Sequence, residues 1–199
     1  EIASCLVGSE MCIETGLTAF EELLETGALD PAEVTLVQLA TPSRERIDHY
    51  RATRSKVEEA VGRINGRFSQ LGRPVVHYQH RSVPKDVLRG YYRLADIMLV
   101  TPFKDGMNLV AKEYVASHSD GSGALVLSEF AGAAVELTQA NLCNPFDIES
   151  IKRALLSAVK ALDESPELMR ENMLAMNRQV REHDIALWSD SFLGALKEA

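Results

Sequence analysis

The stretch "DIMLVTPFKDGMNLVAKEY" (Asp96–Tyr114) decides the fold, because one short segment joins a strand pattern, a turn and a helix start. "DIMLVTPF" is a continuous apolar run of the kind found in strands covered on both faces of a sheet. A charged turn with Gly106 follows, and a helix then begins with Glu113 one turn inside it. Two interpretations are open. The turn is ordinary punctuation between a strand and a helix, or it binds a ligand.

The alternation of strands and helices continues on both sides of this segment. Strand-like runs lie at 34–40, 74–78, 96–103 and 124–128, with a short strand within 141–147. Helical spacing of apolar residues covers 18–26, 47–71, 85–94, 108–118, 147–162, 166–183 and 185–197. This order predicts an α/β fold, a doubly wound Rossmann-like parallel sheet with a helical C-terminal tail.

Ligands of doubly wound sheets bind beyond the carboxyl ends of the strands. The loops in which a site is expected are therefore those at 40–44, 77–84, 101–108 and 127–132. The last of these opens the segment "EFAGAA" (Glu129–Ala134), which is rich in small residues. Two readings of it stay open: close packing of a helix on the sheet, or one wall of a ligand pocket.

Composition sets the class of protein. The chain has 199 residues, 46% of them hydrophobic and 25% charged, which is typical of a globular domain. A net charge of -8 argues against binding to nucleic acid. No apolar run approaches the roughly 20 residues needed to span a bilayer, so no membrane partner is expected. The three cysteines (Cys5, Cys12, Cys143) have no metal-binding spacing, and we expect a cytoplasmic location and no metal site.

The turn and helix start at 105–113 have the chemistry of a phosphate and sugar site. We expect Gly106 to allow a tight turn and Asn108 to cap the helix. The amides of Leu109 and Val110 then lack helical partners, and such an end attracts phosphate. Glu113, one turn on, could accept hydrogen bonds from two vicinal hydroxyls. The alternative is that its carboxylate is merely a solvated charge beside a routine turn.

Three segments carry a family resemblance: "TPFKDGMNLVAKEYVA", "LVLSEFAGAAVEL" and "QLATPSRERIDHY…VEEAVGRINGRF". They are similar to the trehalose-6-phosphate synthases (UDP-forming), which are retaining glucosyltransferases of the two-domain GT-B type. The resemblance begins near Ile13 and covers only the family's C-terminal, nucleotide-sugar domain. It implies transfer of glucose from UDP-glucose to glucose-6-phosphate, and it implies no cofactor and no metal.

The resemblance also implies roles for individual residues. Asp105 would hold the donor glucose and is the candidate catalytic residue, and Glu113 would hold the ribose. Val83 matches a position that contacts the base. Arg44 matches an arginine that binds the acceptor phosphate; without the resemblance it would be a helix-start arginine paired with Glu45 or solvent. The full set implied to bind substrate is Arg44, Val83, Asp105, Gly106, Met107, Asn108, Leu109, Val110, Ala111, Lys112 and Glu113.

The sequence departs from the family near its start. The family clamps the donor diphosphate with an Arg and a Lys in an "RxDYxKG"-like stretch, and the register places the Lys-Gly pair at Met11–Cys12. Residues 1–10 contain no Arg or Lys. We therefore expect a non-family stretch at 1–12, a nucleotide-sugar-binding domain at 13–199, and a missing N-terminal domain. A genuine N-terminal strand in "SCLVG" is the alternative.

Lost cations matter for activity. A charge-assisted clamp on phosphate is worth several kcal/mol, and about 1.36 kcal/mol changes a rate tenfold. We therefore expect no measurable synthase activity from the chain alone. The second reading is a non-catalytic domain of the same family that binds a nucleotide or partner and has a regulatory role. The third is another GT-B glucosyltransferase. The sequence leaves the donor base and the oligomeric state open, including a homo-oligomer.

Overall fold

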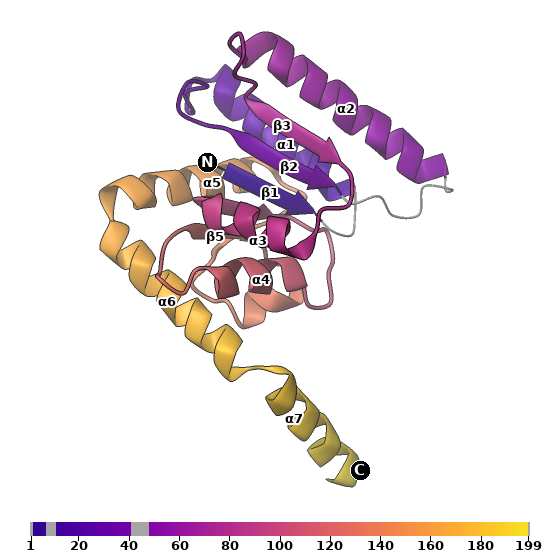
Figure 1. Cartoon of the computed structure of the whole chain (residues 1–199), viewed down its shortest axis with the longest axis vertical. Coiled ribbons are helices and arrows are strands. Elements are labelled where there is room, and N and C mark those ends of the chain that lie inside the picture. The colour runs from indigo at the N-terminus through magenta and orange to yellow at the C-terminus, as the bar shows by residue number, and fades with distance from the viewer. Residues whose placement is uncertain (1, 7–10, 41–47, 199) are drawn as a thin grey trace.

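The chain, described here from a computed structural model over residues 2–6, 11–40 and 48–198, is built on one parallel sheet (Figure 1). Within these residues the sheet has six strands in the order β3-β2-β1-β4-β5-β6, and every pairing between neighbours is parallel. The strands are β1 (Ile2–Leu6), β2 (Leu36–Ala40), β3 (Val76–His80), β4 (Ile97–Val100), β5 (Ala124–Ser128) and β6 (Asn141–Cys143). The predicted doubly wound fold is confirmed.

Helices connect the strands and form the C-terminal tail. They are α1 (Met11–Glu25), α2 (Asp48–Phe68), α3 (Lys85–Leu94), α4 (Leu109–Ser117), the short 3₁₀ helix η1 (Gly132–Val135), α5 (Ile148–Glu164), α6 (Pro166–Glu182) and α7 (Ile185–Glu198). The predicted range of α3 is reproduced, and the others differ mainly by a few residues at their ends. In Figure 1, α7 extends away from the sheet at the C-terminal end.

The first strand and the first helix differ most from expectation. Ile2–Leu6 forms β1 in the middle of the sheet, paired with both β2 and β4, which is the alternative that the sequence left open. α1 begins at Met11, well before the predicted start at Thr18. The missed turns are held by packing: Ile13 and Leu17 are buried, and a Cβ on Gly16 would lie 3.4 Å from the side chain of Leu99.

The sheet separates two apolar cores. Ile97 and Leu99 of β4 belong to the core that includes α1, α2 and α5, whereas Met98 and Val100 belong to the core that includes α3, α4 and α6. β5 alternates in the same way. Since both faces of these strands are buried, their sequences read as unbroken apolar runs, as predicted.

The strand order places a switch point beside the site. The chain runs outward from β1 through β2 to β3, then crosses to β4 on the other side of β1. A crevice at such a point, beyond the carboxyl ends of the strands, is the usual ligand site of this architecture. α4 follows β4 directly there. α6 holds α4 from the side, because Asn177 Nδ2 donates a hydrogen bond of 2.7 Å to the carbonyl of Val115.

His118, the residue that follows α4, is buried. Its Nδ1 lies 2.9 Å from the carbonyl oxygen of Tyr114, which can only accept, so Nδ1 carries the proton. Nε2 is buried without a hydrogen-bond partner among the described residues. Burial is the main cause that lowers the pKa of His118 below its ordinary value. Protonation would therefore place an unpaired charge in the core.

This histidine predicts a pH dependence of stability. Below the unfolded pKa of about 6.5, the unfolded chain binds a proton that the folded chain does not, so stability is lost as the pH falls through the folded pKa. Chemical denaturation at about pH 7.5 and 5.5 should show a lower free energy of unfolding at the lower pH. The difference should shrink in His118→Gln. It should persist in His77→Gln, whose histidine is exposed on β3, and an unchanged difference in His118→Gln would contradict the prediction.

Candidate functional site

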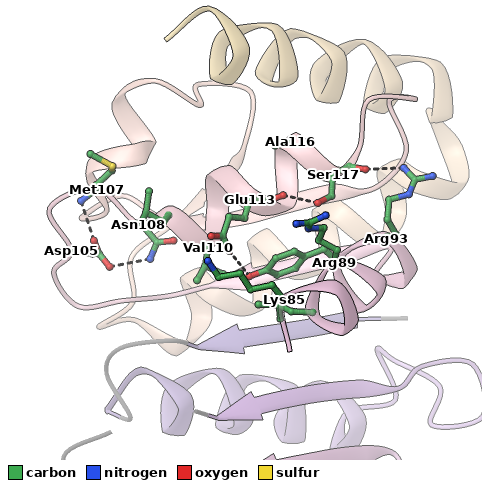
Figure 2. A pocket seen from close by; sticks show the side chains of 13 residues that line it. Lys85, Arg89, Arg93, Asp105, Met107, Asn108, Val110, Glu113, Ala116 and Ser117 are labelled. Atoms are coloured by element: carbon green, nitrogen blue, oxygen red, sulfur yellow. Dashed lines mark hydrogen bonds between the residues drawn. The ribbon is translucent and has the colours of Figure 1, made fainter. Parts of the chain in front are cut away.

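A groove runs between α3 and α4 on one face of the sheet. Its volume is about 1060 Å³. Figure 2 shows Asp105, Met107 and Asn108 at one end, and Arg93 with Ser117 at the other. The residues that line the groove are Lys85, Leu88, Arg89, Tyr92, Arg93, Asp105, Met107, Asn108, Leu109, Val110, Glu113, Ala116 and Ser117. One wall thus comes from α3, and the other from α4 and the turn before it.

The turn before α4 is held by two polar side chains. Asp105 Oδ1 accepts a hydrogen bond of 3.0 Å from the amide of Met107, and Oδ2 accepts one of 3.1 Å from Asn108 Nδ2. Asn108 caps α4, as predicted, because its Oδ1 accepts from the amide of Ala111 at 2.9 Å. The left-handed residue of this turn is Asn108, with φ 69°, a conformation that an Asn tolerates. Gly106 has no positive φ, and its expected role in the turn stays a prediction.

The first turn of α4 borders the groove. Leu109 and Val110 line it, and their backbone N–H groups have no hydrogen-bond partner among the residues that the structure describes. The cap uses only the amide of Ala111. Free amides at the positive end of the helix dipole attract an anionic group. This end of the groove can therefore hold a phosphate.

Glu113 lies in the middle of the groove. Its side chain is exposed, and Tyr92 Oη donates a hydrogen bond of 3.0 Å to its Oε2. The carboxylate sits one helical turn beyond the free amides of Leu109 and Val110. A ligand that spans both features would carry an anion next to a group with hydroxyl donors.

Cations from α3 face the same space. Lys85 and Arg89 line the groove and form no ion pair within the described residues. Arg93 is engaged: its Nη1 and Nη2 each lie 3.0 Å from Asp120, and Nη1 also donates to the carbonyl of Ser117. The hydrogen bond from Arg93 is the main cause that lowers the pKa of Asp120. The remaining cations add positive charge along the α3 wall.

The segment "EFAGAA" is hydrogen-bonded to the turn at 105–107. The amide of Gly132 donates to the carbonyl of Asp105 at 2.9 Å, and that of Ala133 donates to the carbonyl of Met107 at 2.8 Å. A Cβ on Gly132 would lie 2.1 Å from the carbonyl oxygen of Gly106. No residue of this segment lines the groove. Of the two readings, the structure favours close packing, although against the turn rather than the sheet.

The structure brings together six of the residues expected to bind substrate: Asp105, Met107, Asn108, Leu109, Val110 and Glu113 all line the groove. Gly106 and Ala111 do not line it. Lys112 does not either, because its Nζ lies 2.8 Å from Glu136 Oε1 in an ion pair on another side of α4.

Of the two remaining expected residues, Val83 does not line the groove, and Arg44 is not among the described residues. Val83 is half-buried and packs against the core that includes α3 and α4, without lining the groove. Arg44 lies outside the described residues, which resume at residue 48. The roles of both residues stay predictions.

The sequence did not predict that cations of α3 line the groove. Lys85, Arg89 and Arg93 recur every fourth residue, so they share one face of the predicted helix. That spacing is also typical of a solvated surface. Nothing in the sequence says that this face lies against the helix that follows the next strand.

Two other features are absent from the described residues. No group of three or more His, Cys, Asp and Glu side chains there is arranged to hold a metal ion. None of the helices there combines the length and the apolarity needed to cross a bilayer.

Comparison with known proteins places the chain in a family. Residues 9–198 match the sequence profile of glycosyltransferase family 20. The trehalose-6-phosphate synthase of Mycolicibacterium vanbaalenii is 55% identical over 184 residues, which are 92% of this chain and 37% of that protein. The chain thus spans well under half the length of this relative.

The fold is also similar to those of solved trehalose-phosphate synthase structures. An Escherichia coli structure bound with UDP-2-fluoro glucose superposes with a TM-score of 0.91 at 36% identity, over 100% of this chain and 44% of that one. An α,α-trehalose-phosphate synthase (UDP-forming) from Burkholderia xenovorans, in complex with glucose-6-phosphate, gives 0.89 at 36% identity, over 98% and 43%. With nearly all its residues matched by one family, the chain belongs to glycosyltransferase family 20, the family of these trehalose-6-phosphate synthases.

Proposed function

We propose that the chain is the donor-binding part of an α,α-trehalose-phosphate synthase, which transfers glucose from UDP-glucose to glucose-6-phosphate with retention. The observation that carries this proposal is the juxtaposition of free amides at Leu109 and Val110 with the exposed carboxylate of Glu113 in one groove. Because relatives of known structure hold UDP-2-fluoro glucose and glucose-6-phosphate, the proposed donor and acceptor are those substrates.

The donor would lie along α4 from its first turn. Its diphosphate would accept hydrogen bonds from the amides of Leu109 and Val110, in the field of the helix dipole. Its ribose hydroxyls would donate to Glu113. Its glucose would extend toward Asp105, whose two carboxylate oxygens hold the turn and retain lone pairs for sugar hydroxyls.

The chemical contribution of these residues is positioning and charge stabilisation. When the bond from the sugar to the diphosphate breaks, negative charge grows on the leaving phosphate. Amides that are already aimed at that position stabilise the charge without further reorganisation. The free cations Lys85 and Arg89 increase the positive potential of the groove. The family resemblance implies transfer on one face of the sugar, with the leaving diphosphate helping to deprotonate the acceptor hydroxyl.

Titration calorimetry of the chain with UDP tests this function. The wild-type chain should bind, and Glu113→Gln should bind about tenfold more weakly, because a neutral amide accepts hydroxyl hydrogen bonds less strongly than a carboxylate. Glu171→Gln is the matched control, since Glu171 is exposed on α6 and does not line the groove.

The opposite result is equally informative. If neither UDP nor UDP-glucose gives heat at millimolar concentration, the donor site is absent, and a non-catalytic regulatory domain becomes the better description. If UDP binds equally well to Glu113→Gln and to the wild type, the nucleotide does not use this groove as proposed.

A further inference from the structure

Tyr92 has a contact that its burial alone does not explain. Only 2% of the residue is exposed, and its ring packs in the core that includes α3 and α4. Its hydroxyl nevertheless reaches the groove and donates the 3.0 Å hydrogen bond to Glu113 Oε2. A buried ring thus presents its one polar atom to an exposed carboxylate.

This contact restrains the carboxylate. An exposed glutamate without a partner samples many rotamers, and a ligand must order it at an entropic cost. The Tyr92 ring is fixed by its packing, so the hydrogen bond holds Oε2 in one place. Glu113 Oε1 has no hydrogen-bond partner among the described residues and remains available in the groove. An ionised carboxylate has about four lone-pair sites, so one tyrosine leaves room for two hydroxyls.

We infer that Tyr92 is a positioning residue for nucleotide binding, which holds Glu113 in the orientation that receives the two ribose hydroxyls. The inference rests on the proposed function, because it assumes that Glu113 binds the sugar of a nucleoside diphosphate. Tyr92 does not itself contact the ligand in this scheme. It acts by ordering the carboxylate before the ligand arrives.

The test compares two variants and two ligands. Tyr92→Phe removes only the hydroxyl, and its acceptor Glu113 is exposed and can exchange that hydrogen bond for water. Tyr91→Phe is the matched control: Tyr91 is the adjacent tyrosine of α3, its hydroxyl contacts Gln79, and it does not line the groove. Each variant of the full 199-residue chain is titrated with UDP and with 2′,3′-dideoxy-UDP, which lacks both hydroxyls.

The expected result is selective. Tyr92→Phe should bind UDP about fivefold more weakly than the wild type, the usual size of one lost hydrogen bond. It should bind dideoxy-UDP as well as the wild type does, and Tyr91→Phe should resemble the wild type with both ligands. A wild type that binds UDP and a Tyr92→Phe chain that binds it equally well would overturn the inference alone.

Two other outcomes also decide against it. If Tyr92→Phe weakens both ligands equally, the hydroxyl supports the fold of the groove and does not orient Glu113 toward the ribose. If the wild-type chain binds no UDP, the proposed function fails first, and this inference falls with it. Thermal melts of each variant, which should agree within a few degrees, keep a loss of folding from being read as a loss of positioning.

Discussion

Replacing Gly132 with alanine is expected to weaken UDP binding at least about thirtyfold and to destabilise the fold by about 2 kcal/mol. The new Cβ would lie 2.1 Å from the carbonyl oxygen of Gly106 and 2.8 Å from its carbonyl carbon. Both are backbone atoms and cannot rotate away. The turn at 105–107 must therefore move, and with it the two hydrogen bonds that the amides of Gly132 and Ala133 donate to that turn.

The effect on binding is as large as the effect on folding, because the turn sets the start of α4. Asp105 orients both the amide of Met107 and the cap Asn108, so a displaced turn misaligns the free amides that follow. Calorimetry with UDP and chemical denaturation measure the two effects separately. Gly62→Ala is the control for binding, because a Cβ there meets no atom of the described residues within 4 Å. UDP affinity within twofold of the wild type in Gly132→Ala would show that the turn does not position the site.

Replacing Gly123 with alanine is expected to lower the free energy of unfolding by about 3 kcal/mol or more, from backbone strain and a steric clash together. Gly123 has φ +82°, which an alanine adopts only at a cost. Its Cβ would also lie 2.3 Å from the hydroxyl of Tyr114, which is buried and donates to the carbonyl of Ala95 at 3.0 Å. Because Tyr114 is fully buried, any movement of its ring must displace neighbours in the core.

A second glycine separates the two causes. Gly27 has φ +71°, but a Cβ there meets nothing within 4 Å. Gly27→Ala should therefore show the backbone strain alone, about 1–2 kcal/mol. Urea denaturation of both variants measures the difference. Equal losses at Gly123 and Gly27 would mean that the contact with Tyr114 adds nothing to stability.

Much of the fold could be predicted because its signals are local. The unbroken apolar run of β4 and the helical spacing of α3 depend on neighbours in the chain, and both elements appear near their expected positions. The α1 start at Met11 was missed because Gly16 weakens the local helix signal, and this part of α1 is supported by tertiary packing that buries Ile13 and Leu17. The central place of β1 has the same cause, since strand order is set by pairing between distant segments.

The sequence by itself determined the alternation of strands and helices, the cap at Asn108 and the position of Glu113 one turn into α4, since each follows from periodicity or from the chemistry of adjacent residues. Only the tertiary structure decided that α3 forms the opposite wall, that Tyr92 reaches Glu113, and that Gly132 supports the turn. These features join residues that are distant in the chain. Their contacts depend on how the elements pack around the sheet, and no local pattern encodes that packing.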